Sequence, residues 1–378
     1  MSDYLLVTGD FVRTGGMDRA NFALADYLAR QGDAVHLVAY RVAPELLAYP
    51  NVRFHRVPKL LKSYLLSDPL LSRVGEWKAE RIRLTGGRSI VNGGNCLVGD
   101  VNWVHYVHAA YQPEIVGSQL QHWKQHLTHQ IALNKERKAL QRARLIIVNS
   151  ERTKKDLIEK LAVPEQKIHR VYLGIDPTTF YPATFQEKLQ LRQQFGWSAD
   201  RPVVMFIGAL GDRRKGFDTL FAAWKRLCAD PDWDADLVVV GRGAELSQWQ
   251  QRVIEAGLSK RIRFLGFRSD VPDLLRAADC LVAPTRYEAY GLGVHEALCC
   301  GLTALVTATA GVAERYPDNL HTLLLPNSED GGLLSAKLQE WRGNVQDYYL
   351  KMVKVAQDLR SYTWDDMATA ILHKIESI

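Results

Sequence analysis

Several hallmarks of membrane, secreted and metal-binding proteins are missing from this sequence. No apolar run is long enough to form a membrane-spanning helix. The opening MSDYLLVTGDF has neither the basic segment nor the cleavage site of a secretory signal, and it predicts a first strand instead. The five cysteines show no metal-type spacing, and an adjacent pair does not suit a disulfide: Cys96, Cys228, Cys280, Cys299 and Cys300. We therefore expect buried thiols in a reducing cytoplasm.

The composition predicts a folded protein of two domains. At 378 residues the chain exceeds one ordinary core, and 47% hydrophobic with 24% charged residues favours globular structure. The formal net charge is +6, and the basic excess lies in residues 1–173, whereas the remainder is slightly acidic. A membrane surface or a phosphorylated acceptor would suit this asymmetry. No nucleic-acid-binding module accompanies the charge, so we expect no nucleic-acid partner.

Strand-like and helix-like segments alternate along both halves, which predicts an α/β class with parallel sheets covered on both faces. Breaks at Gly174, Pro177 and Pro182 mark a boundary between two doubly wound, Rossmann-like domains facing a crevice. The predicted strands are residues 4–7, 34–38, 89–91, 101–107, 145–148, 202–207, 237–240, 261–264, 280–282 and 303–306. In such sheets ligands bind beyond the carboxyl ends of the strands, so the loops there are the expected site.

The stretch TRYEAYGLGVHEAL, residues 285–298, predicts a phosphate-binding helix start. It follows a predicted strand, and a helix is expected to begin near Gly291, where glycines leave backbone N–H groups open. The helix dipole also attracts phosphate. Glu296 can accept bonds from ribose hydroxyls, and Glu288 can face a sugar ring. The arrangement fits a nucleotide sugar held at both ends.

A second phosphate signal is IGALGDRRKGFDTL, residues 207–220. It follows a predicted strand and opens a helix after Gly216. Arg213, Arg214 and Lys215 stand together in this loop. Guanidinium groups bind diphosphate oxygens bidentately, and lysine adds a mobile charge. Both would stabilise charge on a departing diphosphate, although a charge run alone is usually only solvated.

Weaker signals lie in the first half. Gly15 and Gly16 let the backbone approach a ligand closely. His105 and His108 end a predicted strand, where residues three apart point to opposite faces, so at most one is expected to face the crevice. The loop 232–236, DWDAD, precedes a strand and favours a polar loop over a metal motif. Residues 241–243, GRG, lack the third glycine of a dinucleotide fingerprint.

Together these residues resemble the retaining GT-B glycosyltransferases of family four over nearly the whole chain. The resemblance also includes LIIVNSERTKKDL, YLGIDPTTFYP, VVVGRGAEL, FLGFRSDVPDLLRAADCLVAP and a closing helix after SYTWDD. It implies an acceptor-binding domain over residues 1–173 and a donor-binding domain over residues 174–360. It also implies that a helix within residues 361–378 crosses back to the first domain.

The resemblance assigns roles to individual residues. Glu296 would bind the donor ribose, Glu288 the transferred sugar, and Lys215 the diphosphate. The implied catalytic residues are Arg214, Lys215, Glu288 and His108, and the further donor-binding residues are Gly15, Gly16, Gly208, Arg213, Phe267, Arg268, Ala289, Tyr290, Gly291, Leu292 and Glu296. Two choices stay open. The family pattern has arginine where Ala209 follows Gly208, so Arg214 is the first choice and Arg213 the second. His105 is the alternative to His108.

The resemblance implies transfer from a UDP- or GDP-linked sugar to a glycan or lipid-linked acceptor, with retention and without a metal or other cofactor. Surface polysaccharide or glycolipid synthesis in the cytoplasm is the expected setting. Two alternatives stay open. A sugar-nucleotide epimerase shares this kind of fold and would convert its donor without an acceptor. A non-catalytic nucleotide-sugar-binding protein would bind without turnover.

Two basic segments, residues 59–83 and 122–144, carry much of the positive charge. Each mixes basic residues with apolar ones, and the second is long and helical in pattern. A basic amphipathic helix can lie on an anionic membrane, such as the inner membrane, whereas the plainer interpretation is a solvent-facing helix.

Overall fold

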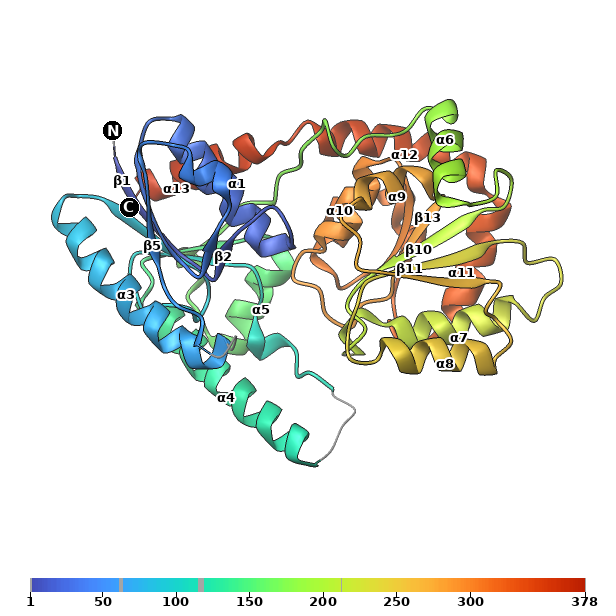
Figure 1. Ribbon diagram of the computed structural model, residues 1–378, viewed down its shortest axis with the longest axis horizontal. Coiled ribbons are helices and arrows are strands. Elements are labelled where there is room, and N and C mark those ends of the chain that lie inside the picture. The colour runs from blue at the N-terminus through green and yellow to red at the C-terminus, as the bar shows by residue number, and fades with distance from the viewer. Residues whose placement is uncertain (1, 61–63, 115–118, 212, 378) are drawn as a thin grey trace. The chain divides into compact units, whose positions relative to one another are not determined.

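The structure is a computed structural model that describes residues 2–60, 64–114, 119–211 and 213–377. The chain divides into two compact units (Figure 1). Residues 1–112, 117–174 and 363–378 form the first, and residues 113–116 and 175–362 form the second. Gly174 therefore belongs to the first unit, one residue later than the expected boundary. Residues 361–362 belong to the second unit rather than to the closing segment.

In the described part of the first unit, parallel strands form one sheet in the order β5, β3, β1, β6, β7, β8, β9. These strands are β1 (Asp3–Val7), β3 (Ala34–Ala39), β5 (Val52–Arg56), β6 (Arg88–Val91), β7 (Val101–Val104), β8 (Leu145–Val148) and β9 (Ile168–Arg170). A two-strand ribbon pairs β2 (Asp10–Phe11) with β4 (Arg41–Val42). The apolar run LIIV of β8 is wholly buried because helices cover both faces of a parallel sheet.

The helices of this unit connect the strands. They are α1 (Gly16–Arg30), α2 (Pro44–Leu47), α3 (Tyr64–Leu84), α4 (Gln119–Arg142), α5 (Glu151–Leu161), α13 (Trp364–Glu376) and the 3-10 turns η2 (His108–Ala110) and η3 (Glu165–Lys167). The two basic segments lie mainly in α3 and α4, although residues 61–63 fall outside the described part. Among the described residues, none of the helices combines the length and the apolar character that a membrane span requires.

The closing helix α13 packs on α1 within the first unit (Figure 1). Arg30 on α1 pairs with Asp365, and the Thr369 hydroxyl donates to the Tyr27 hydroxyl at 3.0 Å. A reciprocal capping box of Thr363 and Asp366 starts the helix. Gly174 lies against the Thr363 backbone, where an added Cβ would meet the carbonyl oxygen at 2.3 Å. A side chain at position 174 would therefore displace the start of α13.

The second unit has its own parallel sheet, in the order β12, β11, β10, β13, β14, β15 over its described residues. Its strands are β10 (Val203–Ile207), β11 (Asp236–Val240), β12 (Ile262–Gly266), β13 (Cys280–Ala283), β14 (Thr303–Thr307) and β15 (Leu324–Leu325). Its helices are α6 (Phe185–Phe195), α7 (Phe217–Leu227), α8 (Leu246–Glu255), α9 (Val271–Ala277), α10 (Leu292–Cys299), α11 (Gly331–Gly343), α12 (Val345–Arg360) and the 3-10 turns η4 (Arg213–Lys215), η5 (Gly311–Arg315) and η6 (Asp318–Leu323).

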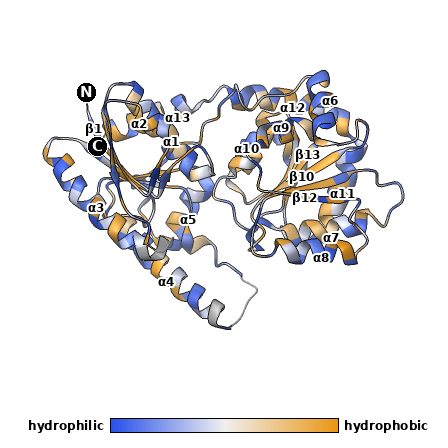
Figure 2. Ribbon diagram, viewed as in Figure 1, coloured by the Kyte–Doolittle hydropathy of each residue, from blue (hydrophilic) through white to orange (hydrophobic). Residues whose placement is uncertain are grey.

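Helices cover both faces of this second sheet. Figure 1 shows α7 and α8 on one face and α9 and α10 on the other. Figure 2 shows hydrophobic residues along β10 and β13, where the strands are buried except at the end of β10. Since the strands run parallel, the loops after β10, β12 and β13 all leave the same edge of the sheet.

One predicted strand was too long. The expected strand 101–107 ends at Val104, and His108 begins the turn η2 instead. The expectation that His105 and His108 alternate across a strand is therefore wrong. The edge strands β5, β9 and β15 and the ribbon β2–β4 were not predicted, because they are short and poorly patterned.

Candidate active site

The loop between β10 and α7 folds tightly against the loop after β13. Gly216 has φ +73°, and an added Cβ would meet the Pro284 carbonyl oxygen at 1.9 Å. Only glycine fits there, so the start of α7 lies directly on the backbone that follows β13. The turn η4 immediately before Gly216 carries Arg213, Arg214 and Lys215. Gly208, which directly follows β10, lies beside Lys215. An added Cβ at Gly208 would lie 3.1 Å from the Lys215 Cγ.

The loop between β13 and α10 is held by the segment after β14. The backbone N–H groups of Gly311 and Val312 donate to the carbonyl oxygens of Glu288 and Tyr290 at 3.1 and 2.6 Å. Gly291 caps α10 with φ +107°, a conformation that favours glycine. An added Cβ at Gly291 would meet Val312, whereas at Gly293 it would meet nothing within 4 Å. The first turn of α10 therefore has open space beside Gly293. Ala289, Tyr290 and Leu292 are buried.

These two loops bring three charged side chains together. Lys215 Nζ donates a short bond to Glu288 Oε2, and Arg214 Nη1 lies 3.8 Å from the same oxygen. The Arg214 side chain also donates to the Tyr287 carbonyl at 3.4 Å. Burial alone would raise the pKa of Glu288, but Lys215 and Arg214 outweigh it and keep the pKa below its ordinary value. Glu288 is therefore ionised at neutral pH and holds two cations beside the start of α10.

Arg213 and Arg214 point to different partners. Arg213 Nε and Nη2 donate to Asp218 Oδ2 at 3.0 and 2.8 Å, whereas Arg214 lies beside Glu288. Asp218 belongs to the first turn of α7. This geometry favours Arg214 for contact with a ligand held by Glu288 and Lys215, and the assignment stays a prediction.

Glu296 lies in the interior of α10 and is only 5% exposed. Its neighbour His295 is buried as well, and the Tyr290 hydroxyl lies 3.0 Å from His295 Nδ1. Burial lowers the pKa of His295 to about 3, so the imidazole is neutral. A neutral imidazole bonded to Tyr290 fixes the loop that precedes α10 without adding charge to it.

The loop after β12 carries two of the predicted donor-binding residues, Phe267 and Arg268. Phe267 is exposed, and the guanidinium carbon of Arg242 lies 4.4 Å from its ring centroid. Arg268 Nε donates to Asp270 at 2.7 Å. The Arg242–Phe267 stack gives a flat apolar surface with a cation behind it. The sequence analysis gave no role to Arg242 itself, although its segment VVVGRGAEL is part of the family resemblance.

In the first unit, the predicted Gly15–Gly16 loop is an exposed turn that opens α1. Gly15 has φ +85°, and an added Cβ would lie 3.5 Å from Asp18 Oδ2. Burial and nearby Asp10 raise the pKa of Asp18 to about 6. A carboxyl group therefore accompanies the glycines that were expected to approach a ligand. This carboxyl group becomes increasingly protonated as the pH falls toward 6.

The two histidine candidates differ in their surroundings. The ring centroids of His105 and Trp103 lie 4.3 Å apart, and burial lowers the pKa of His105 to about 3. His108 is only half-buried, and burial with His129 nearby lowers its pKa to about 4. Both imidazoles are neutral at pH 7, so either would act as a hydrogen-bonding group and not as a cation. Both side chains are partly exposed, so the choice between His108 and His105 stays a prediction.

Glu136 on α4 fixes the turn that carries His108, and no local sequence pattern indicated this role. Its side chain has no exposed surface, and its carboxylate accepts from the backbone N–H groups of His108 and Ala109 at 2.9 and 3.3 Å. Gly94 packs on the same turn of α4, where an added Cβ would lie 2.9 Å from the Glu136 nitrogen. Burial raises the pKa of Glu136 to about 7. The partners lie 27 and 28 residues away in sequence.

We expect Glu136→Gln to change how stability depends on pH. Since the folded-state pKa lies above the unfolded value, the folded protein holds the proton more tightly between about pH 4.5 and 7. Its stability therefore falls as the pH rises through that window, whereas glutamine cannot ionise. The free energy of unfolding of the variant relative to wild type should rise by up to ~3 kcal/mol between pH 4.5 and 8 in urea titrations. A pH-independent difference would contradict this, and exposed Glu80→Gln is the control.

No three His, Cys, Asp or Glu side chains of the described chain are grouped to hold a metal ion. In the 232–236 loop, Asp234 accepts from Arg342 Nε and Nη2 at 2.8 and 2.6 Å, and Trp233 is buried. This loop therefore anchors α11. The cysteines are free, and Cys96, Cys280, Cys299 and Cys300 are buried.

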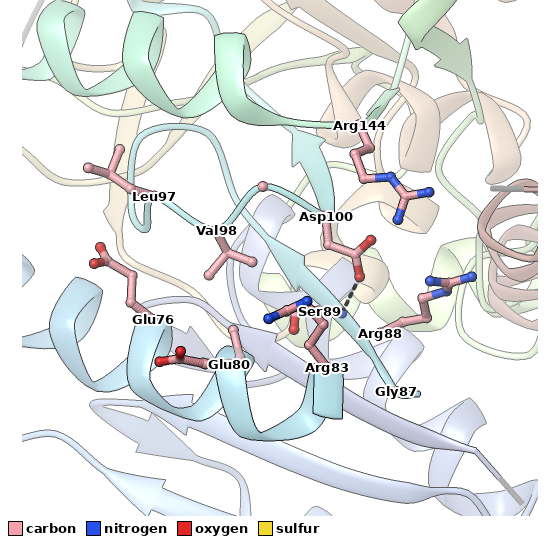
Figure 3. A pocket seen from close by; sticks show the side chains of 12 residues that line it. Glu76, Glu80, Arg83, Gly87, Arg88, Ser89, Leu97, Val98, Asp100 and Arg144 are labelled. Atoms are coloured by element: carbon pink, nitrogen blue, oxygen red, sulfur yellow. Dashed lines mark hydrogen bonds between the residues drawn. The ribbon is translucent and has the colours of Figure 1, made fainter. Parts of the chain in front are cut away.

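The first unit contains a pocket of about 370 Å³ that is lined by none of the predicted site residues (Figure 3). It is formed by α3, the start of β6 and the segment before β7, which is the amino edge of the sheet. Its lining includes Arg83, Arg88 and Arg144 but also Glu76, Glu80 and Asp100. The two signs balance, so the pocket has no excess charge for a phosphorylated ligand.

Comparison with known proteins matches both units to families. Residues 201–340 match the family described as Glycosyl transferases group 1, and residues 14–179 match Glycosyltransferase Family 4. Mannosylfructose-phosphate synthase of Agrobacterium fabrum is 29% identical over 233 residues, 58% of this chain and 50% of that protein. The lipopolysaccharide core biosynthesis mannosyltransferase LpsB of Rhizobium meliloti is 34% identical over 171 residues, 43% of this chain and 44% of LpsB. The chain thus spans about half the length of these relatives.

Solved structures extend the likeness to the whole chain. HepE of Anabaena, in complex with UDP and glucose, has a TM-score of 0.71 at 19% identity and covers 100% of both chains. At this identity the likeness concerns the fold.

Proposed function

Since the chain belongs to the group 1 glycosyltransferases of family four, with the GT-B fold, we propose that it transfers a sugar from a nucleoside-diphosphate sugar to an acceptor. One observation carries the proposal: Arg214 and Lys215 converge with Glu288 beside the start of α10. This edge of the sheet combines cations, the helix start at Gly291 and a buried glutamate on α10, which are groups that can bind a nucleoside diphosphate.

The donor is a UDP- or GDP-linked sugar in this proposal. Its diphosphate is held by Lys215, Arg214 and the first turn of α10, and Glu296 accepts from the ribose hydroxyls. The base lies along the loop of Phe267 and Arg268. The structure of HepE with UDP and glucose supports this class of donor.

The reaction proceeds with retention and without a metal. As the bond between the anomeric carbon and the diphosphate oxygen breaks, Lys215 and Arg214 neutralise the charge that builds on the diphosphate. The acceptor oxygen bonds to the anomeric carbon on the same face, and its proton passes to the departing diphosphate. Glu288 orients Lys215 and accepts hydrogen bonds from the sugar, and we assign it no covalent role. Neutral His108 binds a sugar hydroxyl.

The acceptor is a glycan or a lipid-linked glycan bound by the basic first unit. We place the reaction in the synthesis of a surface polysaccharide or glycolipid in the cytoplasm. The likeness to LpsB, a lipopolysaccharide core mannosyltransferase by name, supports this setting.

The first test is a thermal-shift panel with UDP, GDP, ADP, dTDP, CMP and NAD. A ligand at about 100 times its dissociation constant stabilises the folded state by ~2.7 kcal/mol. Stabilisation by one nucleoside diphosphate would support the donor site, and stabilisation by NAD alone or by nothing would refute it. Incubating the matching nucleotide sugar without acceptor then separates the alternatives, because an epimerase changes the sugar and a pure binding protein leaves the donor intact with every acceptor.

We also propose that the first unit binds an anionic membrane surface. Trp77 on α3 is 48% exposed, and Trp123 on α4 is 64% exposed. The guanidinium carbon of Arg81 lies 3.8 Å from the Trp77 ring centroid, and Lys78 Nζ lies 4.8 Å from it. Exposed tryptophans with adjacent cations suit the membrane interface, where each cation contributes about 1 kcal/mol.

Flotation with vesicles of phosphatidylglycerol and phosphatidylcholine tests the membrane proposal. We expect binding at low salt that is lost in phosphatidylcholine alone, and at least a fivefold weaker partition for the Trp77→Ala, Trp123→Ala double variant. No flotation of wild type at low salt would contradict the proposal.

A further inference from the structure

Arg286 links the two loops of the candidate site and has no assigned role. Its backbone N–H donates to the Arg214 carbonyl at 2.8 Å, and its Nη1 donates to the Arg213 carbonyl at 2.5 Å. One residue of the loop after β13 therefore binds two successive carbonyls of the turn η4. The same loop carries Glu288, two residues further on, so both sides of the Lys215–Glu288 contact are fixed from position 286.

The guanidinium group of Arg286 is close to saturated with partners. Nη1 and Nη2 donate to the two Asp218 oxygens at 2.8 Å each, and Nε donates to Glu329 at 2.8 Å. The side chain is only 8% exposed. The two carboxylates offset the cost of burying its charge, and the planar fork satisfies Asp218 and the Arg213 carbonyl at once.

Through Asp218, Arg286 also fixes the side chain of Arg213. It accepts from both Arg213 and Arg286, and these two arginines hold the pKa of Asp218 below its ordinary value despite burial. Arg213 is thereby drawn to α7, while the next two side chains point to Glu288. An ordinary stabilising ion pair would join two side chains, as Arg342 and Asp234 do in the same unit. Arg286 differs because it also binds the main chain of the turn.

We infer that Arg286 is a positioning residue that sets the direction of Arg214 and Lys215 toward the departing diphosphate. The inference rests on the proposed function of that site. Lysine at this position keeps one charge and reaches Asp218, but it has no planar fork to bind Asp218, Glu329 and the Arg213 carbonyl together. In this variant the η4 turn loses the side-chain hydrogen bond to the Arg213 carbonyl, whereas the ion pair with Asp218 is kept.

The test compares Arg286→Lys with Arg342→Lys, the matched replacement in a bidentate arginine–aspartate pair outside the site. Release of UDP from UDP-glucose is measured without acceptor, with GDP-mannose in parallel, together with melting temperature. Because misplacement by about 1 Å costs up to ~10²-fold in rate, we expect kcat to fall 10- to 10²-fold in Arg286→Lys, with KM changing less than threefold. Arg342→Lys should keep kcat within twofold.

Each outcome decides between the positioning role and a structural one. Equal melting temperatures with a kcat loss confined to Arg286→Lys support positioning. Unchanged kcat in Arg286→Lys, or equal losses in both variants, overturn it. If Arg286→Lys does not fold, Glu329→Gln offers a milder change, because it weakens only the Nε contact and should lower kcat two- to fivefold. Failure of wild type to bind any nucleoside diphosphate would instead refute the proposed function.

Discussion

Lys215→Ala should lower the rate of donor turnover by about 10²- to 10³-fold, the range seen when one preorganised charge-stabilising group is removed. In the resting protein Lys215 is bonded to buried Glu288, and both lie beside the open start of α10. Without Lys215, a departing diphosphate loses its mobile cation, and Glu288 keeps only Arg214 at 3.8 Å. The pKa of Glu288 should then rise, because burial would no longer be offset by two cations.

The measurement is release of the nucleoside diphosphate, with affinity for that diphosphate measured by calorimetry. Lys225→Ala is the matched control, because Lys225 lies on the exposed face of α7 with Nζ 5.5 Å from the Phe221 ring centroid. A loss of affinity with unchanged kcat would assign Lys215 to ground-state binding alone. Turnover within threefold of wild type would remove it from the reaction.

Much of the fold could be predicted because its determinants are local. Buried strands such as β8 and β13 are continuous apolar runs, and glycines at Gly216 and Gly291 mark helix starts to within a residue. The α/β class was confirmed by the structure and its relatives. The edge strand β5 was missed because it is only partly buried, so its sequence VRFHR lacks an apolar run. Short strands such as β15 give even less pattern.

In the site, as in the fold, features with local determinants could be predicted and features that depend on distant residues could not. Arg214, Lys215 and Glu288 could be proposed from loop motifs, and the structure brings them together. Which arginine lies beside Glu288 could not be predicted, because the choice between Arg213 and Arg214 depends on Asp218 and Arg286. The contact of Arg286 with the η4 turn spans 73 residues, and that of Glu136 with His108 spans 28. A carboxylate in a polar helix segment looks solvated until the fold buries it.

The strand prediction for residues 101–107 failed for a related reason. Alternating aromatic and apolar residues continue past Val104, but the backbone turns to bring His108 and Ala109 onto Glu136. The apolar side chain of Val107 is buried, as its residue type predicts. Burial was therefore predictable there, whereas the backbone conformation was set by a partner on α4.

Glu296→Ala should weaken binding of the nucleoside diphosphate by about 10- to 10²-fold, the equivalent of one or two charge-assisted hydrogen bonds. Glu296 is 5% exposed on α10, the helix whose first turn opens beside Gly293. If its carboxylate accepts from the ribose, the loss must depend on the ribose hydroxyls. The wild-type protein should prefer UDP to 2′-deoxy-UDP by at least about tenfold, and the variant should bind the two alike. GDP and 2′-deoxy-GDP serve equally if the panel selects guanine.

This comparison separates a ribose contact from general damage to the helix. A collapsed or unfolded α10 would weaken both nucleotides and leave their ratio unchanged, with a lower melting temperature. Glu296→Gln keeps the side-chain volume and one acceptor oxygen, so it should lose less affinity than alanine, because a neutral acceptor is weaker than a carboxylate. Exposed Glu255→Ala on α8 should leave both affinities unchanged. A variant that binds weakly yet still discriminates between the two nucleotides would place the ribose elsewhere, and Glu296 would then be a buried acid that stabilises α10.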